Sequence, residues 1–252
     1  NNTGTDPVID QIGGLVATPT NATSTNEGMV FDGDGDYVDV EAMTMGGGAI
    51  TIECYTKWDT VVGWSRIIDF GNGMSIDNIL ITKNGDHENI TLQVYDPTTD
   101  TTGDGVSATD SDVNIDIGSI VHWVFVIDDI HKIYKNGINV YTSDSGKGYA
   151  TNKLRTSNRI GISNWFGGDA LFKGTIAYLR IWDGTALTED QIKILYNERE
   201  IVNNESNLIL SSIERVKNSN YISNEISDEE YLFYPSYAWD FRNETGSDTV
   251  YD

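Results

Sequence analysis

The sequence is poor in basic residues and has no long apolar runs. Its 252 residues include 16 Lys and Arg against 39 Asp and Glu, a formal net charge of −23 at pH 7. Because nucleic-acid binding depends on Lys and Arg side chains that neutralise phosphates, this charge excludes it as a main function. The longest apolar stretch, around Trp123 to Ile127, is far shorter than the roughly 20 residues that span a bilayer, so we expect no transmembrane segment.

Cysteine is nearly absent. Cys54 is alone and cannot form an intrachain disulfide, so the fold must be stabilised by its apolar core. With 38% hydrophobic residues and six Trp, the chain has enough apolar area for that. The acidic excess has two interpretations, solubility in salty surroundings or carboxylate clusters that bind Ca²⁺.

Short runs rich in Val, Ile, Tyr, Phe and Trp recur between clusters of Gly, Asn and Asp, a pattern typical of antiparallel β-sandwiches. Alternation predicts that Ile50, Ile52 and Cys54 point to the core. Asn136-Gly137 lies between two alternating runs and predicts a hairpin with a type I′ turn. We expect strands at residues 28–31, 37–40, 49–57, 65–70, 78–82, 90–95, 120–128, 131–135, 138–142, 159–163 and 174–182.

One helix is predicted, over residues 188–200. Thr188 and Gln191 have the spacing of a capping box, in which each side chain bonds the backbone of the other residue. Ile192 and Leu195 then begin an apolar stripe that can pack on a sheet.

The end of the sequence repeats its start. Residues 243–252 match residues 1–10 at a constant offset of 242 residues, and six of the ten positions are identical. Self-similarity at a fixed period is typical of repeat proteins. We expect the chain to be a window cut from a tandem array with that period; a chance likeness of two stretches rich in Asn, Thr and Gly is the alternative.

Three parts of the chain follow from these patterns. We expect residues 1–200 to form the sandwich. Residues 201–236 are rich in Asn, Ser and Glu without a clear period, which indicates a linker or an extended arm. Residues 237–252 are expected to be the first strand and the start of a next repeat unit.

An assembly strand is predicted within that last part. Residues 237–242 alternate like an edge strand, with Tyr237, Trp239 and Phe241 on one side. We expect this strand to complete the next unit of the array or to pair with a neighbouring chain by strand addition.

Several segments carry a likeness to a known family in both order and spacing. They are Phe31-Asp32-Gly33-Asp34-Gly35-Asp36-Tyr37-Val38, residues 49–57, His122-Trp123-Val124-Phe125-Val126, Ile133-Tyr134-Lys135-Asn136-Gly137, Arg159-Ile160-Gly161, residues 172–182, residues 186–192 and Leu195-Tyr196. This series resembles the laminin G-like, concanavalin A-like lectin/glucanase superfamily over about residues 1–198.

The resemblance implies a module that commonly binds glycans or proteins in extracellular multidomain chains. The fold class that we expect is all-β: a two-sheet antiparallel jelly-roll sandwich of the concanavalin A-like kind, with one short C-terminal helix and an extended C-terminal arm.

Two departures from the family pattern bear on function. Some members use an acidic residue after the Ile of a Gly-x-Ile strand for calcium, whereas this chain has Ala177 there. The glucanase branch carries Glu-x-Asp-x-x-Glu on one strand, but Glu53 is followed by Cys54, Tyr55 and Thr56. Because retaining hydrolysis needs two carboxyl groups about 5 Å apart, we disfavour a glycoside hydrolase and expect no enzyme.

Three carboxylates at alternate positions, Asp32, Asp34 and Asp36, form a candidate metal site. The spacing is typical of the first half of a calcium loop, although Met43 stands where an EF-hand requires Glu. The alternative, which we favour, is a tight turn in which Asp side chains cap backbone amides. Calcium is thus the one candidate cofactor, at these residues.

A candidate ligand site combines rings with polar neighbours. Trp165 and Phe166 lie in a predicted loop with Asn164 and Asp169, and Trp64 lies in another. Sugar sites commonly pair an aromatic platform with amide or carboxylate hydrogen bonds. The alternative is that large rings fill the ends of the core, which we favour for Trp64.

The function that we expect is a non-enzymatic binding or adhesion module for a glycan or protein ligand. It would act on an extracellular or particle surface, as a secreted, cell-surface or virion protein. The alternative is a structural repeat unit of a virion, appendage or surface layer, joined to neighbouring units or chains by its C-terminal strand. Five Asn-x-Ser/Thr sequons fit a secretory route.

Overall fold

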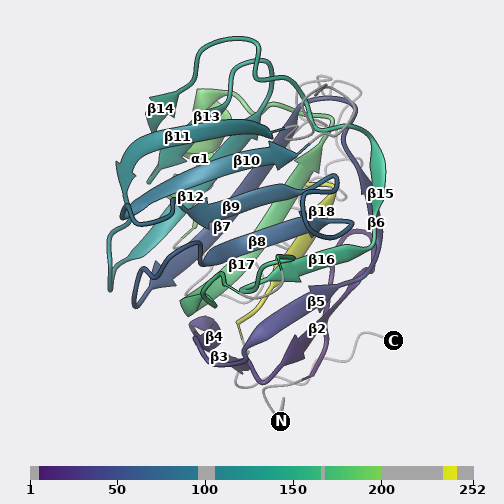
Figure 1. Ribbon diagram of the computed structural model, residues 1–252, viewed down its shortest axis with the longest axis vertical. Coiled ribbons are helices and arrows are strands. Elements are labelled where there is room, and N and C mark those ends of the chain that lie inside the picture. The colour runs from purple at the N-terminus through teal and green to yellow at the C-terminus, as the bar shows by residue number, and fades with distance from the viewer. Residues whose placement is uncertain (1–5, 96–105, 166–167, 200–234, 243–252) are drawn as a thin grey trace, which may run out of the picture.

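Two antiparallel β-sheets pack face to face in the computed structural model, which describes residues 6–95, 106–165, 168–199 and 235–242 (Figure 1). The predicted sandwich is thereby confirmed. No helix within these residues is long and apolar enough to cross a membrane.

Sheet A faces the viewer in Figure 1. Its strands pair in the order β1 (Val8–Ile9), β2 (Val16–Thr20), β5 (Tyr37–Val40), β16 (Ser157–Ile160), β8 (Arg66–Gly71), β9 (Ile79–Lys83), β10 (Asn89–Tyr95) and β11 (Val106–Asn114).

Sheet B lies behind sheet A. Its strands pair in the order β14 (Ile138–Thr142), β13 (Lys132–Lys135), β12 (Ile120–Ile127), β7 (Ile50–Trp58), β17 (Lys173–Asp183), β4 (Gly28–Asp32) and β3 (Thr23–Thr25), with β18 (Tyr237–Asp240) also paired to β17. A small two-stranded sheet pairs β15 (Lys153–Arg155) with β6 (Met43–Met45).

The core lies between the two sheets, and the alternation of β7 shows how the sequence builds it. Ile50, Ile52 and Cys54 are fully buried in the main apolar cluster, as predicted. Glu53 and Tyr55 point to the other face of sheet B, where they are also buried. Sheet B is therefore covered on both faces over this strand.

Local signals predicted two further features correctly. Asn136 and Gly137 have φ angles of 52° and 75°, and they join β13 to β14 in the expected hairpin. Helix α1 (Glu189–Glu198) begins after Thr188, and the reciprocal capping box with Gln191 is present. Its Ile192 packs with residues of β12 and β17 on the outer face of sheet B.

Six strands were absent from the predicted set: β1, β2, β3, β6, β11 and β15. They are short or polar, and β2 contains Pro19, which weakens a strand pattern. Several of them pair with the next strand along the chain, as β1 does with β2 and β3 with β4, but segments this short or polar carry little strand signal of their own.

The assembly strand lies in the chain's own sheet B. Residues Tyr237–Asp240 form β18, which pairs with Tyr178–Ile181 of β17. This strand was expected to complete a next unit or to pair with a neighbour, so its place here differs from that expectation: the sandwich includes part of residues 237–252. Residues 201–234 and 243–252 lie outside the described residues, and the linker, the next unit and the array stay predictions.

Candidate functional site

The candidate site is built on the outer face of sheet A, beginning with β8. Ile68 and Phe70 of this strand lie in the core, and Asp69 lies on the opposite face; a bulge between Arg66 and Ile68 allows Arg66 to share that face with Asp69. Both polar side chains are buried although they face away from the core. A segment from another part of the chain must therefore cover these side chains and supply their hydrogen-bond partners.

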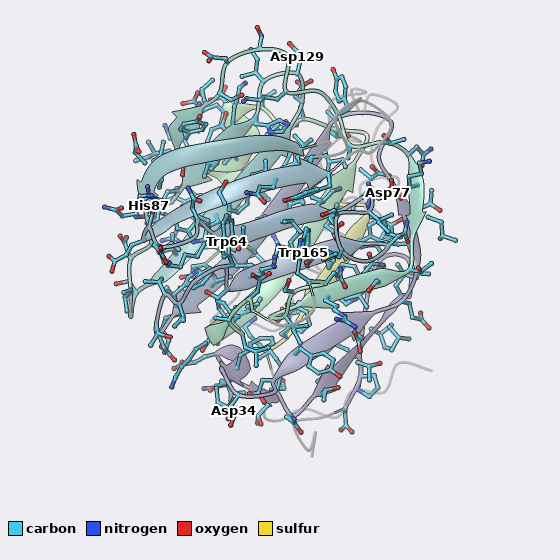
Figure 2. The ribbon with its side chains drawn as sticks, viewed as in Figure 1. Asp34, Trp64, Asp77, His87, Asp129 and Trp165 are labelled. Atoms are coloured by element: carbon cyan, nitrogen blue, oxygen red, sulfur yellow. The ribbon has the colours of Figure 1, made fainter. Side chains whose placement is uncertain are left out.

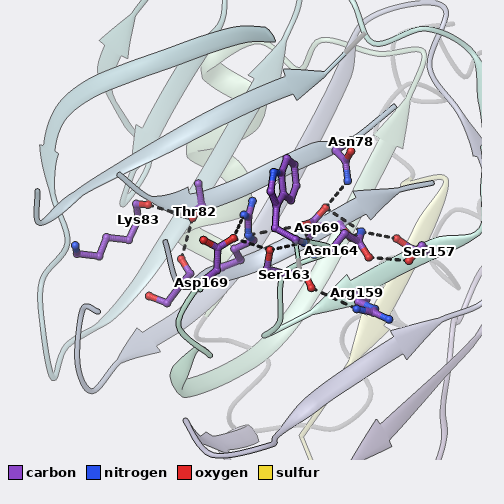
Figure 3. Close-up of polar contacts among 12 residues, drawn as sticks. Asp69, Asn78, Thr82, Lys83, Ser157, Arg159, Ser163, Asn164 and Asp169 are labelled. Carbon is purple, nitrogen blue, oxygen red and sulfur yellow. Dashed lines mark hydrogen bonds and ion pairs between the residues drawn. The ribbon is translucent and has the colours of Figure 1, made fainter. Parts of the chain in front are cut away.

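The cover is the loop between β16 and β17. The backbone N–H of Asn164 donates to Oδ2 of Asp69 over 2.7 Å, and its side-chain amide donates to Oδ1 over 3.0 Å. Asn78 donates to the same Oδ1 over 2.7 Å, and Oδ1 of Asn164 accepts from Ser157 (Figure 3). These bonds fix the loop to the sheet at Asp69.

Arg66 links two carboxylates. Its Nε lies 3.6 Å from Oδ2 of Asp69, and its Nη2 donates to Oδ2 of Asp169. Ser163 also donates to Asp169, over 2.7 Å, and accepts from the backbone N–H of Trp165. Because the chain is bonded on both sides of it, the Trp165 ring is held in place.

The Trp165 ring lies over the guanidinium group. The Arg66 Cζ atom is 4.5 Å from the ring centroid, and Tyr95 meets the ring edge to face at 5.2 Å. Such cation–π and aromatic contacts stabilise the orientation of the ring. Trp165 is only half-buried, so part of it remains open to solvent.

Trp64 lies on the same face of the molecule, in the loop before β8 (Figure 2). We favoured a core position for it, and that is wrong: the residue is 36% exposed, with a φ angle of 58°. The tight turn at Gly85 lets the indole lie close to the backbone there. Ala170 donates to the carbonyl of Gly63 over 3.0 Å, which joins the Trp64 loop to the Trp165 loop.

Electrostatics show how the site tolerates its buried charges. Burial raises the pKa of Asp69 above its usual range, and the Arg66 guanidinium and the hydrogen bonds from Asn164 and Asn78 partly oppose that rise. Asp69 therefore fixes the covering loop to the sheet, and its burial makes it inaccessible as a base.

The structure brings most of the predicted ligand residues together. Trp165, Asp169 and Trp64 lie on joined loops. Asn164 belongs to the same cluster, but it is buried and its amide is bonded within the protein. Phe166 lies outside the described residues.

Arg66 and Asp69 were not predicted. Asp69 interrupts the apolar run Ile67-Ile68-Asp69-Phe70, and a lone carboxylate in such a strand was an available signal. Its partner Asn164 is 95 residues away, and no local pattern connects the two.

The candidate metal residues form the turn between β4 and β5. Oδ2 of Asp36 accepts from the backbone of Asp32 over 2.8 Å, and Oδ1 of Asp32 accepts from Asp34 over 2.7 Å. The capped turn that we favoured is thus present, far from Trp165 in Figure 2. Within the described ranges, no three acidic, His or Cys side chains gather as metal ligands would. Calcium binding at this turn stays a prediction.

Comparison with known proteins gives a family match and several similar folds. Residues 32–193 match the family model described as the concanavalin A-like lectin/glucanases superfamily. Among curated proteins, no sequence matches.

Among solved structures, domain 4 of AbnA, a GH43 extracellular arabinanase from Geobacillus stearothermophilus in complex with arabinotriose, superposes with a TM-score of 0.58. It is 18% identical, and the match covers 73% of this chain and 89% of that one. A sialidase from Trypanosoma rangeli in complex with sialic acid gives a TM-score of 0.54 at 13% identity, covering 77% of this chain and 31% of the sialidase. These likenesses establish a shared fold, and the match spans about a third of the sialidase.

Proposed function

Since the chain belongs to the concanavalin A-like lectin/glucanases superfamily, we propose that it binds carbohydrate through the outer face of sheet A. The observation that carries this proposal is the presence of two solvent-accessible indoles, Trp165 and Trp64, on loops joined by a hydrogen bond. Aromatic faces pack against the apolar faces of sugar rings, and nearby polar groups fix their orientation.

Polar groups around Trp165 support the same proposal. Asp169 is partly exposed beside the ring and has hydrogen-bonding capacity for sugar hydroxyls. Arg66 and Ser163 hold its carboxylate in place, so little entropy is lost on binding. The arabinanase domain, whose structure contains arabinotriose, shows that a domain of similar fold takes an oligosaccharide.

We propose binding without hydrolysis. Glycoside hydrolysis uses two carboxyl groups that both reach the scissile bond. Asp69 and Asp169 both pair with Arg66, but Asp69 is fully buried and accepts hydrogen bonds from Asn164 and Asn78. Within the described cluster around Arg66, Asp169 is the carboxylate that remains partly accessible, and it is paired with that arginine.

A glycan array tests the proposal, with the full chain applied in the presence and absence of EDTA. We expect a defined set of oligosaccharides to bind, and Trp165→Ala to weaken each by about tenfold or more, as truncating a central aromatic anchor does. Trp64→Ala should weaken the longer oligosaccharides more than the shorter ones, because that ring lies on the neighbouring loop.

Tyr149→Ala is the matched control, because Tyr149 is an exposed aromatic residue on a different loop. Circular dichroism should show that all variants are folded. Binding that is absent under every condition, or equal for Trp165→Ala and the control, contradicts the proposal. Release of reducing ends from a bound glycan would contradict the non-enzymatic part alone.

Calcium and location belong to the same proposal. An effect of EDTA that Asp34→Asn abolishes would place calcium at the β4–β5 turn, whereas calorimetry without heat on adding Ca²⁺ would exclude it.

We further propose that the module acts outside the cell or on a particle surface. Detection of the native protein in the medium or on the surface by antibody, and its absence from the cell interior, is the expected result.

A further inference from the structure

Strand β18 is held by partners that are all distant in sequence. Its backbone pairs with β17, where Leu179 lies opposite Trp239. At its start, the N–H of Ala238 donates to Oδ1 of Asp10 over 2.7 Å, and its carbonyl accepts from Gln11 over 2.9 Å. At its end, the carbonyl of Phe241 accepts from Ser24 over 2.7 Å.

We name this binding place the β17 slot: residues 177–181 of β17 together with Asp10, Gln11, Leu15 and Ser24. Trp239 and Phe241 are each 1% exposed in the main apolar core, and the indole N–H of Trp239 donates to the carbonyl of Leu15 over 3.2 Å. The slot therefore takes a strand with alternating large rings and pairs its backbone on two sides.

None of these contacts depends on how β18 is connected to the rest of the chain. Residues 200–234 separate it from α1. Apart from the bonds that Arg242 donates to Asp240, the hydrogen bonds of residues 237–241 go to β17 and to residues 10–44. A strand of the same sequence from another copy would make the same bonds. Because the contacts are the same, the free energies of the closed and the exchanged forms differ mainly through the effective concentration of the strand at the slot. That concentration is higher when strand and slot belong to one chain.

The repeated sequence contains a second copy of a residue that binds β18. Asp10, whose carboxylate accepts the Ala238 N–H, is one of the six residues that recur in 243–252, where Asp252 takes its place. In sequence, β18 leads directly into that repeat, whereas Asp10 lies 228 residues from Ala238. The residue that anchors β18 here is thus encoded again close behind it.

From these observations we infer that β18 is an exchangeable junction strand, and that the β17 slot accepts β18 from a second copy of this chain. Each copy that donates its strand leaves its own slot open for the next. Reciprocal exchange gives a closed dimer, and one-way exchange gives a chain of copies. This role is independent of carbohydrate binding at Trp165, which lies in a loop outside the slot.

Engineered cysteines in full-length chains test the inference. Ile181 and Tyr237 are opposite each other in the β17–β18 pairing, and the sole native thiol, Cys54, is buried. Ile181→Cys and Tyr237→Cys chains of different tag length are mixed at about millimolar concentration, where exchange competes with intramolecular pairing. The mixture is warmed to the start of melting, cooled and oxidised.

We expect a disulfide-linked heterodimer on a non-reducing gel, several-fold above the amount formed by Ile181→Cys with Tyr149→Cys. Tyr149 is the matched control because it is an exposed tyrosine remote in sequence from the slot. The double variant with both cysteines in one chain shows that the positions can bond. Heterodimer no more abundant than in the control would overturn the inference.

A second readout needs no cysteine. After the same warming and cooling, light scattering on the unmodified chain should reveal dimers or larger species that return to monomer on dilution and rewarming. Trp239→Ala, which removes the anchor of the strand, should give fewer of them by a large factor. An unmodified chain that stays monomeric at millimolar concentration would overturn the inference whatever the disulfide result.

Discussion

At the scale of single residues, Glu53 shows how sheet B buries a charge. Its Oε1 lies 2.8 Å from Nε2 of His122 and 3.3 Å from the Tyr178 hydroxyl, and Arg180 donates to Oε2 over 3.1 Å. Burial by itself raises the pKa of a carboxyl. Here Arg180 and His122 outweigh burial, and the pKa of Glu53 is lowered from its usual value.

The pH dependence of stability follows from that direction. A carboxyl whose pKa is lower in the folded state stabilises the fold above its unfolded pKa of 4.5, and this contribution is lost as the pH falls through the folded value. Glu53→Gln should lower the free energy of unfolding at pH 7 by about 3–5 kcal/mol, since it removes one partner of a buried ion pair. It should also flatten the loss of stability below pH 4.5.

Urea denaturation at a series of pH values from 3 to 7 measures both effects. Glu27→Gln is the control, because Glu27 is exposed and far in sequence from this cluster. Equal slopes for Glu53→Gln and the unmodified chain below pH 4.5 would show that Glu53 does not contribute to acid unfolding.

Residue types alone predicted part of the candidate site. Trp165 and Asp169 were found because an aromatic pair beside polar residues in a loop is a recognisable combination. Arg66 and the exposure of Trp64 were not, because they depend on which distant loop covers β8 and on the turn at Gly85.

At the scale of elements, β7 and β17 pair over most of their length and approach closely at Gly174. A Cβ atom there would lie 2.0 Å from the carbonyl oxygen of Lys57, and the φ angle is 155°. Only glycine tolerates both conditions without moving the strands.

Gly174→Ala should therefore destabilise the protein by about 2–4 kcal/mol, from the strained conformation and the clash together. Gly146→Ala separates the two causes: its φ angle is also positive, at 82°, but no atom lies within 4 Å of the added methyl group. Thermal and urea unfolding of both variants measure the difference. Equal losses for the two would assign the whole effect to backbone conformation.

Elements with local signals were predicted well. The Asn136-Gly137 hairpin and the start of α1 are set by residues within a few positions of each other. The β18 pairing could not be predicted, because an alternating pattern indicates a strand but does not identify the strand that it pairs with. Its register with Tyr178–Ile181 depends on the slot, which is formed by residues far apart in the chain.

At the scale of the whole molecule, the net charge of −23 acts against the compact fold. Like charges repel across the surface, and at low ionic strength this repulsion extends over tens of ångströms. We expect the melting temperature to rise by several degrees between about 0.01 M and 0.15 M NaCl at pH 7.

The same salt series near pH 4.2, the isoelectric point, is the control, because the net charge there is close to zero. The salt effect should nearly vanish. A rise of equal size at both pH values would point to a general salt effect on apolar burial.

Overall architecture was the part most accessible from the sequence, since many separate strand and turn signals agree on one sandwich. The polar cluster under Trp165 was least accessible, because each of its bonds joins segments that only the finished fold brings together.

The hydrogen bond between Gln11 and Ala238 places the first and last described strands beside each other. A pulling force applied between residues 6 and 242 would load β1 at one end and the hydrogen bonds of Phe241 at the other before it reached this contact. Because Trp239 and Phe241 lie in the main apolar core, tension that pulls β18 away would act on the core itself and not only on a surface strand.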